Sequence, residues 1–194
     1  MDNLVKIIDI VIWPLTIIFV VFFLRKEIRK LLQRVSSLKY KDIEAKFEKE
    51  LADVERKAKT TIDKPNIKKS FNNEPVYPEP YDEKYSQLLR IAEESPRAAL
   101  LEGWVEVENA FYAAAKQFEV KSYSSKNIRK ILAELIETGH YAKTVYPMVE
   151  DIYSLRNQAA HTPVFIPTEK QIKRYLQITI EMALTFKNPL NIKI

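Results

Sequence analysis

The segment MVEDIYSLRNQAAH, residues 148–161, decides how the C-terminal part of the chain folds. Its apolar residues recur at steps of four, three and four, which is the spacing of one stripe on an α-helix: Met148, Ile152, Leu155 and Ala159. Pro163 follows two residues after His161 and disfavours a continuing helix, so the helix is predicted to end near His161. The spacing therefore predicts a helix with one buried face.

Three polar residues near the end of this predicted helix are the candidate catalytic residues: Arg156, Asn157 and His161. Asn157 and His161 are four residues apart and share a face nearly opposite the apolar stripe, so His161 is not expected in the core. A histidine takes or gives a proton near neutral pH, and a guanidinium forks onto phosphate oxygens. These residue types suit chemistry on a phosphodiester. The alternative is a surface arginine and a terminal histidine that only complement the helix dipole.

Four more helices are predicted between residues 81 and 194 from apolar spacing and capping residues. Their starts are Asp82, the Ser95–Pro96 pair, Ser124 or Ser125, and the capping box Thr168–Gln171. Gly103 lies inside the second of these helices, where glycine costs about 1 kcal/mol relative to alanine. A close helix crossing would explain that glycine. The expected fold class is all-α, with an antiparallel bundle of about five helices at residues 81–194.

Two stretches of this region resemble the HEPN superfamily of helical domains, and the likeness covers residues 81–190. SPRAALLEGWVEVE, residues 95–108, looks like the second helix of membrane-attached members. LRNQAAH, residues 155–161, matches the superfamily's pattern of arginine, polar residue, three further residues and histidine. One branch places a tyrosine two residues after the histidine; Pro163 stands there in this chain, so the chemistry of that branch is not carried over.

The resemblance implies a metal-independent endoribonuclease. His161 would act as general base or acid on the RNA, Arg156 would stabilise the charged phosphorane, and Asn157 would orient the pair. Superfamily sites are usually built between two subunits, which implies a homodimer through the bundle. Many members serve in toxin or antiphage systems, so a defence effector is one expectation. Other members are non-catalytic, and a dimerisation, RNA-binding or docking module for a partner protein is the alternative.

The N-terminal segment is almost wholly apolar at residues 4–24, and residues 10–24 carry no charge. A helix of this length spans roughly 31 Å, which matches the hydrocarbon core of a lipid bilayer. The sequence therefore predicts a transmembrane anchor at residues 1–24. Residues 25–41 then contain seven basic residues against Glu27 alone.

The positive-inside rule accordingly predicts a single-pass protein with its N-terminus outside and its C-terminal domain in the cytoplasm, a location that fits a prokaryotic inner membrane. Five of the basic residues are expected at the membrane surface: Arg25, Lys26, Arg29, Lys30 and Arg34.

Two segments connect the predicted anchor to the bundle. Residues 25–59 predict a basic juxtamembrane segment, within which apolar and charged residues alternate at 38–47. That alternation slightly favours two short strands, with a helix that contains a stutter as the other possibility. A heptad oligomerisation stalk is a rival interpretation of the region. Residues 60–80 contain four prolines and predict a linker.

Composition excludes several classes of site. The 194 residues include two glycines and no cysteine, which excludes glycine-rich phosphate loops, thiolate zinc sites and a cysteine nucleophile. His140 and His161 are the only imidazoles, and no acidic cluster is evident, so neither a metal nor a cofactor is predicted. The net charge of +5 permits contact with phosphates without requiring it.

Overall fold

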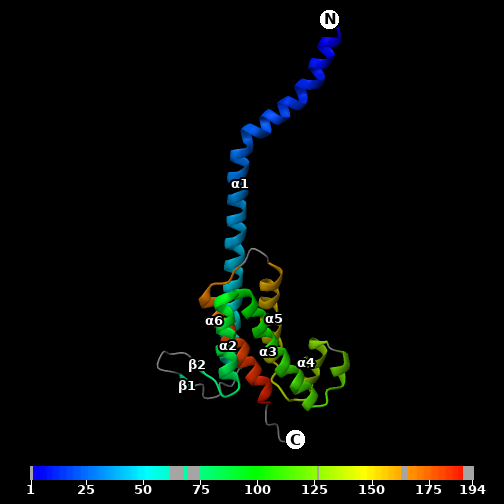
Figure 1. Ribbon diagram of the computed structural model, residues 1–194. Coiled ribbons are helices and arrows are strands. Elements are labelled where there is room, and N and C mark those ends of the chain that lie inside the picture. The colour runs from blue at the N-terminus through cyan, green and yellow to red at the C-terminus, as the bar shows by residue number, and fades with distance from the viewer. Residues whose placement is uncertain (1, 62–67, 70–74, 126, 163–165, 190–194) are drawn as a thin grey trace. The chain divides into compact units, whose positions relative to one another are not determined.

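The computed structural model of the protein describes residues 2–61, 68–69, 75–125, 127–162 and 166–189 (Figure 1), with side chains at 12–26, 42–60 and in the ranges from 75 onward. The elements are α1 (Asp2–Thr61), β1 (Lys68–Lys69), β2 (Pro75–Val76), α2 (Tyr81–Glu94), α3 (Pro96–Gln117), the 3₁₀ helix η1 (Lys121–Ser125), α4 (Ile128–Glu137), α5 (Val145–His161) and α6 (Glu169–Lys187). The two short strands pair antiparallel, Lys68 opposite Val76. The chain divides into two compact units, Met1–Ile43 and Glu44–Ile194.

The first unit contains the N-terminal part of α1 and contradicts the membrane prediction. Among the described residues, no helix combines the length and the apolarity that a bilayer crossing requires. The apolar side chains described in this unit run from Ile12 to Leu24. The same helix continues beyond Leu24 into a highly charged stretch. The predicted anchor at residues 1–24, and the single-pass localisation derived from it, are therefore wrong.

The five residues predicted at the membrane surface all belong to α1. Arg25 and Lys26 are exposed, and the Arg25 guanidinium carbon lies 4.3 Å from the centroid of the Phe22 ring. Arg29, Lys30 and Arg34 belong to α1, and their side chains lie outside the described set.

The prediction of short strands at residues 38–47 is also wrong, because α1 is helical through this whole stretch. The reason lies just downstream, where four apolar residues at helical steps are buried against the bundle: Phe47, Leu51, Val54 and Ala58. This 3.6-residue period extends over several turns and outweighs a brief alternation upstream. The second compact unit accordingly begins at Glu44 and includes the end of α1, whereas the bundle was predicted at residues 81–194.

The end of the proline-rich segment packs on the bundle as well. Tyr77 is 3% exposed, and its ring meets that of Tyr85 edge-on at 5.3 Å between centroids. The backbone N–H of Tyr77 donates to Asp82 Oδ1 at 3.0 Å. Asp82 therefore fastens the preceding segment, and the N-cap position of α2 is Pro80.

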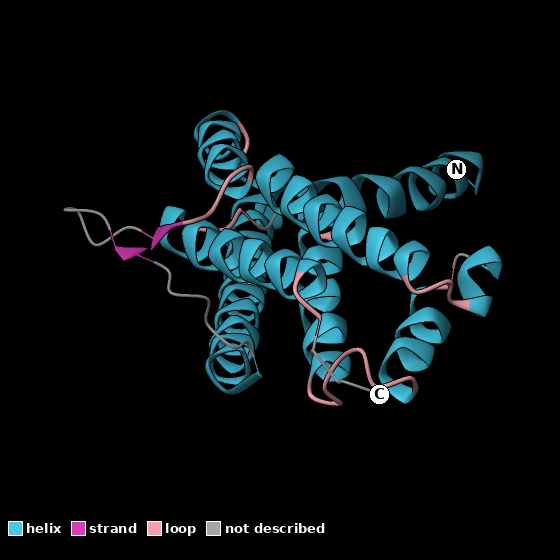
Figure 2. Ribbon diagram, turned by 90° about the horizontal axis from the view of Figure 1, so that it is seen from below, coloured by secondary structure: helices cyan, strands magenta, loops and turns pink. Residues whose placement is uncertain are grey.

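The centre of the bundle is the packing of α3 against α6, with α2 and α5 also in contact with α3 (Figures 1 and 2). A Cβ atom at Gly103 would lie 2.8 Å from Leu176 Cδ2 and 3.1 Å from Thr179 Oγ1. The close helix crossing inferred from this glycine is confirmed.

Capping residues set several helix boundaries as the sequence predicts. Ser95 Oγ accepts from the N–H of Ala98 at 3.3 Å, and Thr168 and Gln171 form a reciprocal capping box. The start of α4 differs from the prediction, since its N-cap is Asn127 rather than Ser124 or Ser125.

Docking of α1 predicts that Leu51→Ala destabilises the second unit. Leu51 has 0% of its surface exposed, and truncating a buried leucine costs about 2–5 kcal/mol. Denaturant unfolding of the full chain measures the loss, with Lys49→Ala, at an exposed position of the same turn, as the control. Equal stability of the two variants would show that the end of α1 does not belong to the folded core.

The crossing at Gly103 predicts that Gly103→Ala destabilises the bundle by about 1–3 kcal/mol, because the added methyl overlaps α6. Helix propensity alone would change stability by about 1 kcal/mol in the opposite direction. Ala113→Gly, at an exposed position of α3, reports propensity without a crossing. A stabilised Gly103→Ala protein in thermal unfolding would contradict the close approach.

Candidate functional site

The three predicted site residues lie on the last two turns of α5. Arg156 and Asn157 are half-buried, and His161, the final residue of the helix, is exposed. Arg156 Nη1 donates a hydrogen bond to Asn157 Oδ1 at 3.0 Å. The structure therefore joins Arg156 directly to Asn157 and leaves the imidazole accessible one helical turn further along.

The charge of Arg156 acts on Tyr175 of α6. Tyr175 is fully buried, and burial raises the pKa of its hydroxyl, an effect that the positive charge of Arg156 opposes. Tyr175 Oη and Arg156 Nε are both buried and have no hydrogen-bond partner among the described residues. The Nε side of the guanidinium thus faces the protein, while Nη1 is bound to Asn157. Sequence reasoning missed Tyr175, because only the fold brings α6 next to this turn.

A second arginine reaches the same end of α5. Arg97, in the first turn of α3, donates from Nη2 to the backbone carbonyl of Thr162 at 2.7 Å. The N–H of Thr162 donates to the carbonyl of Gln158 at 3.1 Å and so closes the last turn. A contact from α3 therefore holds the backbone of the residue that follows His161.

The other side of the same α5 segment contacts α1. Gln158 hydrogen-bonds through Nε2 to the Glu50 carboxylate, and Ser154 Oγ donates to the same carboxylate at 3.5 Å. Lys57 pairs with Asp151 one turn earlier. Sequence reasoning did not place α1 at the site, although the helical spacing of its apolar residues was a signal for packing.

An ion cluster fastens α1 to α6 beside these contacts. Arg174 donates to both carboxylate oxygens of Glu55 at 2.7 Å, and it also pairs with Glu48. Gln171 Nε2 donates to Glu48 at 3.0 Å. Burial by itself would raise the pKa of Glu48, but the hydrogen bonds from Arg174 and Gln171 lower it below its usual value. Because its hydrogen-bond donors are directed at these carboxylates, Arg174 holds α1 against α6.

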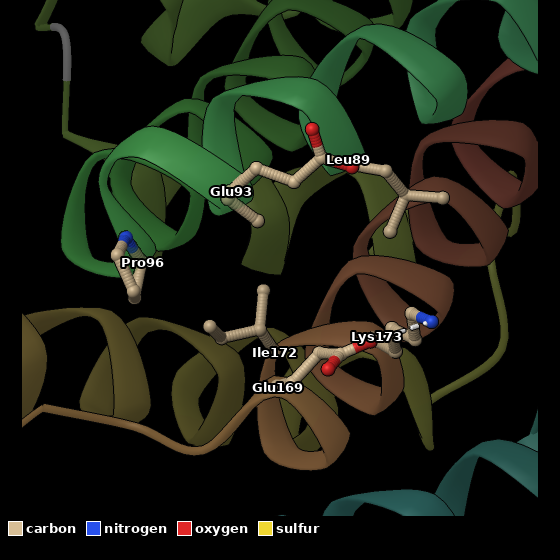
Figure 3. A pocket seen from close by; sticks show the side chains of 7 residues that line it. Leu89, Glu93, Pro96, Glu169, Ile172 and Lys173 are labelled. Carbon is tan, nitrogen blue, oxygen red and sulfur yellow. Dashed lines mark ion pairs between the residues drawn. The ribbon is translucent and has the colours of Figure 1, made fainter.

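A pocket of about 440 Å³ lies among α2, α3 and α6 (Figure 3). Glu169 and Lys173 form an ion pair at 2.9 Å on its wall, and Glu93 and apolar side chains such as Leu89 and Ile172 line the rest. No histidine lines this pocket. Within the described ranges, no three His, Asp or Glu side chains come together as a group that could hold a metal ion. The end of α5 remains the candidate site with an acid–base group.

Comparison of the chain with protein-family models, curated proteins and solved structures found no match. The resemblance to the HEPN superfamily therefore enters the functional argument as a hypothesis.

The Glu48 contacts predict an acid-sensitive junction between α1 and α6. A carboxylate whose pKa is lowered in the folded state stabilises the fold above its unfolded pKa, and this contribution disappears as pH falls through the folded pKa. Unfolding free energy between pH 7 and pH 3 should therefore fall less steeply for Glu48→Gln than for the wild type. Glu94→Gln, at an exposed position of α2, should follow the wild-type curve. Identical curves for all three proteins would show that Glu48 contributes nothing to the junction.

Proposed function

We propose that the protein is a metal-independent endoribonuclease of the HEPN type whose active residues are Arg156, Asn157 and His161. One observation carries the proposal: a guanidinium bound to Asn157 at 3.0 Å lies one turn before an exposed histidine at the end of α5. A fixed cation beside an accessible acid–base group is the pair that phosphodiester cleavage requires.

The reaction follows from these groups. The imidazole of His161 takes the proton of an RNA 2′-OH, and the 2′-oxygen attacks the adjacent phosphorus. The bond from phosphorus to the 5′-oxygen breaks, and that oxygen leaves with a proton from an acid such as the protonated imidazole of a second copy. The products are a 2′,3′-cyclic phosphate and a free 5′-OH. Arg156 stabilises the extra negative charge on the phosphorane, and Asn157 keeps the guanidinium oriented.

A second copy of the chain completes the proposed site. One protomer offers a single imidazole at this site, whereas the reaction has a proton to remove and a proton to deliver. His161 is exposed at the surface of its own protomer. A twofold contact along this end of α5 would bring two imidazoles and two guanidinia to one phosphodiester.

The chemistry predicts that His161→Ala lowers RNA cleavage by roughly 10²–10⁴-fold, the usual loss for a missing acid–base group. Arg156→Lys should also be severe, because an ammonium cannot reproduce the fork of a guanidinium. Incubation of the full chain with RNA in EDTA should give cyclic-phosphate ends, and DNA should resist because it lacks the nucleophile.

His140→Ala is the matched control, because His140 is not one of the proposed residues. Its ring stacks on that of Phe118, with 3.7 Å between the two centroids. Full activity in His161→Ala would overturn the catalytic proposal and favour a non-catalytic binding or docking module.

A further inference from the structure

A tyrosine extends the line of the proposed catalytic residues along α5. Tyr153 precedes Asn157 by four residues, and His161 follows by another four, so the three share one helix face. At 1.5 Å per residue, Tyr153 and His161 are about 12 Å apart along the axis. Tyr153 is 38% exposed, which is high for so large an aromatic side chain. The proposed chemistry does not use it.

A pocket of about 590 Å³ opens beside Tyr153. Its aromatic side is formed by Tyr153 and Trp104, whose ring centroids are 5.2 Å apart. Trp104 is only 2% exposed, so it is a rigid support against which the tyrosine ring is packed. The volume is within the range of roughly 300–1,000 Å³ that is typical of small-molecule sites.

The opposite side of the pocket is polar and comes from the start of α4 and the middle of α5. Arg129 of α4 is bound in a bidentate pair to Glu150 of α5, with Nε and Nη2 each 2.9 Å from a carboxylate oxygen. Asn127 Oδ1 caps α4 by accepting from the N–H groups of Arg129 and Lys130. The amide NH₂ of Asn127 has no acceptor among the described residues and remains able to donate to a ligand.

Basic side chains of η1 and α4 lie near the pocket. The described ones are Lys121, Arg129 and Lys130. Arg129 is paired with Glu150, and Glu134 accepts from the backbone N–H groups of Lys121 and Ser122, so Lys121 and Lys130 supply the positive charge. An aromatic face, an amide donor and a basic border are the features with which proteins bind single-stranded nucleic acid. A duplex would not fit, because its bases stack on one another and do not present a free face.

We propose that the pocket beside Tyr153 is a nucleobase subsite, which takes an unpaired base of single-stranded RNA near the scissile phosphate. The base stacks on the exposed face of Tyr153, and Asn127 donates to its edge. The phosphates pass along the basic η1–α4 border toward Arg156 and His161. The subsite rests on the proposed function, since it selects unpaired RNA for the same reactive end of α5.

The test measures RNA binding apart from cleavage. The full-length His161→Ala protein and a fluorescein-labelled single-stranded RNA 12-mer are used in fluorescence anisotropy, at a fixed salt concentration. In this protein the additional change Tyr153→Ala should weaken RNA binding about 5- to 100-fold, because one base–aromatic stack is lost. Adding Tyr153→Phe keeps the ring and should change binding less than about twofold. Thermal unfolding of both variants checks that the Trp104 contact has not been lost with the fold.

A change in the RNA provides a second test that does not depend on the stability of a variant. A series of 12-mers contains an abasic nucleotide at successive positions. At one position it should weaken binding to the His161→Ala protein, which retains Tyr153, and to the same protein with Tyr153→Phe. That same position should have no further effect on Tyr153→Ala, because base and ring act as one pair. Additive effects at every position, or equal binding by the alanine and phenylalanine variants, would overturn the subsite.

The two proposals fail separately. Absence of cleavage by the wild type, together with Tyr153-dependent binding, would overturn the nuclease and leave the subsite standing. Cleavage by the wild type with binding that does not depend on Tyr153 would overturn the subsite alone. A chain that binds no RNA at all overturns both.

Discussion

The close approach of α3 and α6 at Gly103 is the constraint on which the bundle and both functional proposals depend. With no side chain at that position, α6 can bring Leu176 and Thr179 to the backbone of α3. The same approach places Tyr175 at the crossing, 3.4 Å from where a Cβ of Gly103 would lie. The positive charge of Arg156 acts on Tyr175, so this crossing also shapes the surroundings of the guanidinium.

The residue after Gly103 extends this constraint to the other end of the proposed RNA path. Trp104 is buried, and its ring packs against that of Tyr153 on α5. Two successive residues of α3 therefore contact different helices, Gly103 at α6 and Trp104 at α5. Helix α5 carries the proposed acid–base group, the proposed phosphate ligand and the proposed stacking surface on adjoining turns.

The end of α1 contributes to the bundle in two ways. Its apolar face fills the core through residues such as Leu51, and its acidic side chains bind polar groups of α5 and α6. Glu50 contacts Gln158, which lies between the proposed catalytic residues in the sequence. The end of α5 is therefore held by α1 through Gln158 and by α3 through the contact of Arg97 with Thr162. Rigid support of this kind is what a preorganised site needs.

Sequence by itself determined the features that depend on neighbours within a few residues. The apolar stripe that includes Leu155 predicted α5, and the Ser95 cap and the Thr168–Gln171 box predicted the starts of α3 and α6, because capping and helical periodicity are local. The tertiary structure decided what depends on distant partners. It assigned the end of α1 to the bundle, made 38–47 helical, contradicted the membrane anchor among the described residues, and brought Tyr175 within the influence of the Arg156 charge. These outcomes depend on contacts between apolar surfaces and charges that are far apart in the sequence. A short window of sequence does not contain that information.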